Sequence, residues 1–186
     1  ASDVYKRQPP PYMILFIIFV ILFLILVNAF YVAAEFAAVS VRRNMIREMA
    51  EGGSKVAAHL LRILENTKEL DRYIAACQFG ITISSLILGA YGQVELSAYL
   101  LPLFERFGGM DSVMANSVAA IVVLVVLTVL QVILGELMPK SLALQFPKQA
   151  ALYTYYPMRW TLTFFAWFID FLNGSGLPVS YTHLRA

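Results

Sequence analysis

The sequence has few charged residues, one cysteine and two histidines. Charged residues make up only 14% of its 186 positions, whereas 60% are hydrophobic. Soluble domains have about 25% charged and about 45–50% apolar residues. The formal net charge is only +2. This lack of polar and basic residues disfavours a disordered chain, a collagen-like repeat and a nucleic-acid-binding protein.

The scarcity of cysteine and histidine also limits the chemistry. The single cysteine, Cys77, excludes an internal disulfide and a multi-cysteine metal site, and we expect it to be a buried thiol. The two histidines, His59 and His183, are not placed at a useful spacing from a serine, and no aspartate pair replaces them. We therefore predict that the chain is not an enzyme.

The two ends of the chain differ from the rest. Residues 1–8 and 179–186 resemble translated adapter sequence, as found at the edges of genes taken from assembled DNA. We expect both to be artefactual tails and leave them out of fold reasoning. The domain itself is expected over residues 9–178.

Long uncharged apolar runs predict three membrane spans. A bilayer core needs about 20 apolar helical residues, and residues 12–34, 75–94 and 112–135 each meet that requirement without a charged residue. Residues 152–172 are also apolar but rich in aromatics, which favour the membrane interface. We interpret them as a juxtamembrane or half-inserted helix, and a full fourth span remains the alternative. The expected fold is an all-α membrane protein.

Residues 41–72 form a different kind of segment, with seven basic and five acidic residues. Glycines at 52 and 53 divide it, and apolar side chains recur at helical spacing in its second part, which predicts an amphipathic helix at the membrane surface: Val56, Leu60, Leu61 and Leu64. The expected loop at 95–111 has one basic residue, Arg106. The bias of basic residues therefore predicts that residues 41–72 and those after 140 are cytoplasmic, with the N-terminus outside a cell membrane (the inner or plasma membrane). The five acidic residues dilute the positive charge of 41–72, so we favour this topological role over binding of anionic lipid.

Two carboxylates lie at the ends of predicted spans, where ionisable residues are costly and usually functional. Glu35 ends the first span, and Asn28 lies two turns before it on the same helix face. Glu136 ends the third span. The alternative for each is a carboxylate at the interface paired with a nearby base, such as Glu136 with Lys140.

The second predicted span carries a polar stripe. Gln78, Thr82 and Ser85 are spaced i, i+4 and i+7 and so share one face of the helix. These side chains suit an ion site, but they also suit hydrogen bonding between helices. Close helix packing is favoured by the small residues of the same span: Gly80, Ser84 and Gly89.

Pro139 adds a backbone ligand. Because proline has no N–H, the carbonyl of Gly135 loses its helical partner beside the Glu136 carboxylate. Carboxylate, carbonyl, hydroxyl and amide oxygens together suit a hard divalent cation such as Mg²⁺. With no histidine or cysteine among them, zinc and copper are disfavoured.

Three segments carry a resemblance to the CNNM/CorC transmembrane family. Residues 28–43 resemble its first-helix signature, and Gln78 to Thr82 with Gly89 is similar to its second-helix motif. The most specific match is Leu-Gly-Glu-Leu-Met-Pro-Lys-Ser-Leu-Ala at 134–143, which resembles its third-helix motif.

The resemblance implies a homodimeric membrane domain that exports Mg²⁺ or Co²⁺, coupled to Na⁺ entry. It implies that Glu136 is the ion-site carboxylate and that the polar residues of the second span face it. Full-length members carry a cytoplasmic pair of CBS domains that binds ATP, so the partners expected here are membrane lipid, a second copy and such a pair. The alternative is a non-transporting anchor that dimerises and holds CBS-type sensor domains at the membrane.

Overall fold

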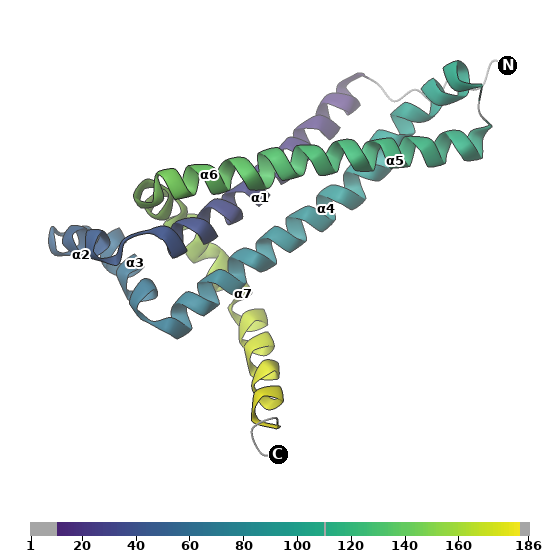
Figure 1. Cartoon of the computed structure of the whole chain (residues 1–186). Coiled ribbons are helices and arrows are strands. Elements are labelled where there is room, and N and C mark those ends of the chain that lie inside the picture. Colours follow the sequence, from purple (N-terminus) through teal and green to yellow (C-terminus); the bar gives the residue numbers. More distant parts are fainter. Residues whose placement is uncertain (1–10, 110, 183–186) are drawn as a thin grey trace. The chain divides into compact units, whose positions relative to one another are not determined.

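The computed structural model describes residues 11–109 and 111–182, with side chains for residues 12–106, 109 and 111–165. Within these ranges every regular element is a helix (Figure 1). The elements are α1 (Pro11–Ser40), α2 (Arg43–Glu51), α3 (Lys55–Glu65), α4 (Thr67–Gly108), α5 (Ser112–Leu130), the π-helix η2 (Gln131–Leu137), α6 (Met138–Gln145) and α7 (Pro147–Thr182). The predicted all-α fold is confirmed.

The three predicted spans coincide with helices that are long and apolar enough to cross a membrane. These are Tyr12–Ser40, Thr67–Arg106 and Ser112–Gln145. The aromatic helix expected at 152–172 lies inside α7, which is not among the candidate spans in the described residues. Of the expected tails, residues 1–8 and 183–186 lie outside the described residues, and 179–182 belong to α7.

The loop predicted at 95–111 is wrong. The helix α4 continues through Glu95 and Pro102 to Gly108, so its uncharged run is less than half of its length. It continues because Leu96, Tyr99 and Leu100 pack against a hydrophobic core beyond the first charged residue. A charge therefore marked the end of the uncharged run but not the end of the helix.

A short connection joins α4 to α5. Gly109 has a φ of +59°, in the left-handed region that glycine adopts without strain. The carboxylate of Asp111 then accepts a hydrogen bond from the backbone N–H of Met114 at 3.2 Å and caps the N-terminus of α5.

The chain divides into two compact units, each described by itself. The first comprises the described parts of residues 1–29 and 82–137. Its core is built from residues four apart on α1, from α4 and from α5: Ile17, Ile21, Ile25, Leu88, Val123 and Leu127. Gly92 allows close packing here, because a Cβ at this position would lie 2.5 Å from Cδ1 of Leu127.

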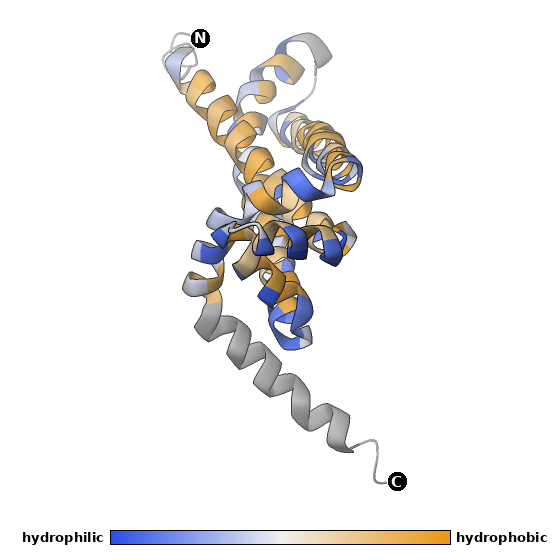
Figure 2. Ribbon diagram, turned by 90° about the vertical axis from the view of Figure 1, so that its left-hand side faces the viewer, coloured by the Kyte–Doolittle hydropathy of each residue, from blue (hydrophilic) through white to orange (hydrophobic). Residues whose placement is uncertain are grey.

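The remaining faces of α1 and α5 are apolar and exposed. Ile121, Leu124 and Val125 of α5 are exposed, as are Phe16, Phe19 and other large apolar side chains of α1. The helix that follows the N label in Figure 2 is orange along most of its length. Such all-round hydrophobicity is typical of helices that face lipid.

The second unit comprises the described parts of residues 30–81 and 138–186. It contains the helical pair α2 and α3, which is formed by most of the charged segment 41–72. The break predicted at the two glycines is present: Gly53 has a φ of +92°, and the Ser54 hydroxyl accepts a hydrogen bond from the N–H of Ala57 at the start of α3. The Arg47 guanidinium donates to Glu65 at 2.5 Å, which raises the pKa of Arg47 and links α2 to α3.

The predicted apolar face of α3 is buried in the core of this unit. Leu60 and Leu64 are buried together with Ala57, and Val56 and Leu61 pack at the edge. The same core contains Cys77, whose thiol lies 3.8 Å from Sδ of Met158. The expectation of a free, buried thiol is confirmed.

Candidate functional site

The first unit contains a buried polar network centred on Asn28. Its side chain is fully buried on α1. Nδ2 donates a hydrogen bond to the carbonyl oxygen of Gly135 at 3.0 Å. Oδ1 accepts from the hydroxyls of Ser84 and Ser85 at 3.0 and 3.1 Å. One amide thus joins α1, α4 and η2.

Gln131 extends this network by one residue. Its Nε2 donates to the Ser85 hydroxyl at 2.6 Å, and that hydroxyl in turn donates to Asn28. The three side chains form a continuous chain of hydrogen bonds that ends at the Gly135 carbonyl. In a low-dielectric environment such a chain is costly to break, because each polar group left without a partner stays buried.

The π-helix η2 places both Gln131 and Gly135 in the network. Both residues are buried and lie four apart within η2, whereas the residues between them are exposed. Short π-helical stretches within α-helices are frequently found at functional sites. Pro139 follows as the second residue of α6, so the chain remains helical through the proline and changes helix type just before it.

Gly135 packs closely against Asn28. A Cβ at position 135 would lie 3.0 Å from Nδ2 of Asn28, so the amide would have to shift by a few tenths of an ångström to make room for an alanine. The Gly135 carbonyl, expected to lie free beside Glu136, accepts a hydrogen bond from the Asn28 amide instead.

Glu136 itself has an exposed side chain. The large neighbouring side chains of the same candidate span are also exposed and are apolar: Ile133, Leu134, Leu137 and Met138. Lys140, the base named as its alternative partner, places Nζ 4.4 Å from the centroid of the Phe36 ring in the second unit. The carboxylate therefore lies on an apolar surface of a candidate span.

The other sequence-predicted residues are divided between the two units. In the second unit, Nε2 of Gln78 donates to Oε1 of Glu35 at 3.3 Å. Gly80 lies against Tyr31, where a Cβ would be 2.5 Å from ring carbons, whereas a Cβ on Gly89 in the first unit would meet nothing within 4 Å. The polar stripe is thus divided: Gln78 bonds to Glu35, Ser85 bonds to Asn28, and Thr82 is exposed.

Two members of the network were not predicted from the sequence as site residues. Ser84 was assigned to packing only, and Gln131 was not considered. The spacing of Gln131, four residues before Gly135 in an otherwise apolar run, was the signal that could have identified it. The network has amide, hydroxyl and carbonyl oxygens but no charge, and the described residues contain no group of three acidic, histidine or cysteine side chains placed to hold a metal.

Comparison with known proteins identifies a family to which the chain is similar. The model of the CNNM family, described as the Cyclin M transmembrane N-terminal domain, matches residues 19–179. The chain belongs to the CNNM family. This CNNM domain is a multi-pass membrane domain, as its candidate spans indicate.

Curated relatives agree with this assignment. The CNNM domain is 40% identical to UPF0053 protein YhdT of Bacillus subtilis over 152 residues, which are 82% of this chain and 32% of YhdT. It is 37% identical to UPF0053 protein YrkA of the same organism, covering 82% of this chain and 34% of YrkA. A more distant relative, the polyamine export protein of Haemophilus influenzae, is 27% identical over 82% of this chain and 35% of that protein. The chain spans about a third of the length of these relatives.

Proposed function

We propose that this CNNM domain is the membrane part of a cation exporter, with Mg²⁺ as its substrate and Na⁺ as the coupled ion. The observation that carries the proposal is the position of Glu136. Its carboxylate is exposed among exposed apolar side chains of a candidate span. A charge in such a place is expensive in lipid and indicates a substrate pathway by default.

The oxygens next to Glu136 support a hard cation as the substrate. The Gly135 carbonyl is one residue away and accepts from the Asn28 amide, whose oxygen in turn accepts from the Ser85 hydroxyl. Mg²⁺ binds oxygen ligands, keeps several waters and needs few carboxylates. In this proposal Glu136 supplies the negative charge, and the neutral network supplies dipoles that hold the Gly135 carbonyl in place.

A polyamine is the second cationic substrate to be tested. A distant relative is named a polyamine export protein, and a polyamine is also a cation that carboxylate and carbonyl oxygens can bind. We favour Mg²⁺ because the site offers one carboxylate beside compact neutral donors rather than a row of spaced carboxylates.

The test is efflux from cells that express the chain and are loaded with Mg²⁺ or with spermidine. Glu136→Gln keeps the size of the side chain and removes its charge, so it should lower Mg²⁺ efflux at least tenfold while the protein remains folded. Glu51→Gln, which changes an exposed carboxylate on α2 outside the candidate spans, is the matched control. Unchanged Mg²⁺ efflux with Glu136→Gln, or efflux of spermidine alone, would contradict the proposal.

The second candidate function is a non-transporting anchor. One observation favours it: the members of the Asn28 network bond to one another, as expected of a clamp between helices. An anchor predicts no change in the thermal stability of the purified chain when Mg²⁺ or Na⁺ is added. An exporter predicts stabilisation by Mg²⁺ that Glu136→Gln removes.

The proposal includes an arrangement in the cell. The chain lies in the inner or plasma membrane with its N-terminus outside, and residues 41–72 and those after 140 are cytoplasmic. It forms a homodimer, and a cytoplasmic CBS-domain pair that binds ATP completes the full-length protein. Cysteine-accessibility labelling from each side of the membrane, with cysteines introduced at Arg43 and Asp111, tests the orientation.

A further inference from the structure

The second unit contains a cavity that the proposed export function does not use. It has a volume of about 620 Å³, within the range of about 300–1,000 Å³ typical of ligand pockets. It lies between α3, the first turns of α4, and α7. Its walls include the buried ring of Tyr73 and the side chains of Leu162 and Ile63.

The charged residues of this cavity are mostly basic. Three arginines line it, Arg62 from α3, Arg72 from α4 and Arg159 from α7, together with His59. Among the lining side chains that the structure describes, Glu69 is the only acidic one, and its Oε2 is 3.6 Å from Nε of Arg62. The other four acidic residues of 41–72 are not among the described side chains that line the cavity, and Arg159 is contributed by α7, far along the chain. The folded structure thus concentrates positive charge that the sequence disperses.

The cavity is at the level where a membrane surface is expected. Arg72 is three residues before the uncharged run 75–94, a rise of about 4.5 Å along a helix. Headgroups begin where the apolar run ends, and arginine side chains near helix ends reach that level.

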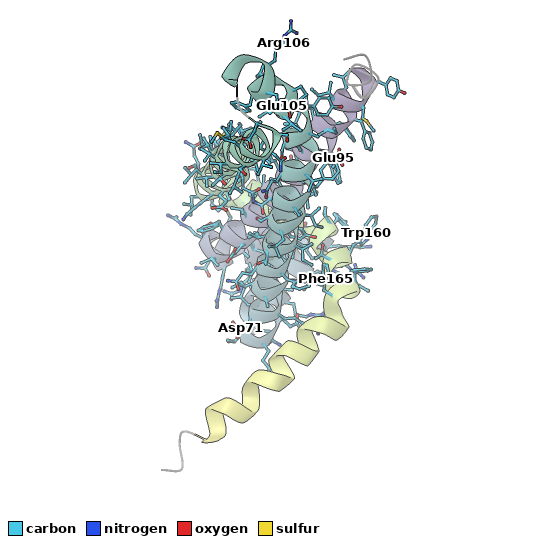
Figure 3. All side chains as sticks on the ribbon, turned by 90° about the vertical axis from the view of Figure 1, so that its right-hand side faces the viewer. Asp71, Glu95, Glu105, Arg106, Trp160 and Phe165 are labelled. Atoms are coloured by element: carbon cyan, nitrogen blue, oxygen red, sulfur yellow. The ribbon has the colours of Figure 1, made fainter. Side chains whose placement is uncertain are left out.

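An aromatic face of α7 lies beside the cavity residues of the same helix. Four aromatic side chains spaced three or four residues apart share this face and are exposed: Tyr153, Tyr156, Trp160 and Phe164. Trp160 is 80% exposed and projects from α7 in Figure 3. Tryptophan and tyrosine are enriched at membrane interfaces. The residue next to Trp160 is Arg159, so one helix presents rings suited to the interface and a cation to the cavity.

We propose that this cavity binds the phosphate of an anionic phospholipid headgroup. Guanidinium groups form paired hydrogen bonds with phosphate oxygens, and three arginines from three helices match the several oxygens of one phosphate. The ring face of α7 would lie among the upper acyl chains, and its position favours a lipid over a soluble phosphate. The bound lipid would then tie α3 and α7 to the membrane surface.

The test uses the whole chain, purified in a mild detergent. Thermal stability and native mass spectrometry are measured with added dioctanoyl phosphatidylglycerol, dioctanoyl phosphatidylcholine or inorganic phosphate. Phosphatidylglycerol should bind and stabilise the chain, and the other two should have little effect. Arg159→Gln and Arg62→Gln should each weaken phosphatidylglycerol binding about fivefold. Arg43→Gln, an exposed arginine of α2 that does not line the cavity, is the matched control and should leave binding unchanged.

Arg62 and Arg159 have exposed side chains, so these variants should fold, and unchanged thermal stability without lipid checks this. Equal binding of the two lipids would overturn the proposal, as would equal loss of binding in Arg43→Gln and Arg159→Gln. Stabilisation by inorganic phosphate that competes with phosphatidylglycerol would assign the cavity to a soluble phosphate and would also overturn it. Because Glu136 is not part of the cavity, failure here leaves the export proposal untouched.

Discussion

Replacing Asn28 by alanine is the sharpest test of the polar network. The change removes three hydrogen bonds: those to the Gly135 carbonyl and from the Ser84 and Ser85 hydroxyls. Hydrogen bonds between helices in membranes contribute about 0.6 kcal/mol each on average, and at most about 1.7. Three of them give about 2 kcal/mol, and the cavity left by the amide adds about 1 kcal/mol.

The expected loss is therefore about 2–3 kcal/mol, which lowers the unfolding temperature of a domain of this size by roughly 4–12 °C. The assay is thermal unfolding of the purified chain in detergent, followed by circular dichroism. Asn116→Ala is the matched control, because Asn116 is an exposed asparagine in α5 of the same unit. Both variants gain the same helix propensity, so their difference isolates the network. Equal unfolding temperatures for the two variants would refute the assignment of Asn28 as its centre.

Three further expectations use the same preparation. Gly135→Ala should lower the free energy of unfolding by about 1–3 kcal/mol, since its Cβ would meet the Asn28 amide at 3.0 Å, whereas Gly89→Ala should be neutral or stabilising because its Cβ would meet nothing within 4 Å. Thermal unfolding measures both variants, and equal effects of Gly135→Ala and Gly89→Ala would contradict the close contact between position 135 and Asn28. Leu60→Ala should cost about 2–5 kcal/mol, because this side chain is 1% exposed in the core under α3. Cys77 should resist a bulky maleimide in the folded chain and react only in denaturant, and rapid labelling of the native protein would contradict its burial.

Most of the helical architecture could be predicted from hydropathy. The requirement for about 20 apolar residues located all three candidate spans, and the glycine pair located the break between α2 and α3. The end of α4 could not be found in this way. The uncharged apolar run stops before Glu95, but α4 continues to Gly108 because Tyr99 and Leu100 pack against the core of the first unit.

The candidate site was only partly accessible from sequence. Helical spacing correctly groups residues along one helix, but it does not say which neighbouring helix each of them meets. Gln78 and Ser85 share a predicted stripe, yet one bonds to Glu35 and the other to Asn28. The hydrogen bond between Asn28 and Gly135 joins residues that are 107 positions apart, and no local pattern encodes such a pairing.

The π-helical turn of η2 also sets the phase of the helix that contains it. Buried residues recur every fourth position from Ala115 to Gly135. In a uniform α-helix each such step rotates by about 40°, so this row would wind by about 200° around the axis. Wider turns advance each residue by a smaller angle, which slows the winding over the last step. Gln131 and Gly135 are thereby kept near one face of the helix, and both reach the Asn28 network from it.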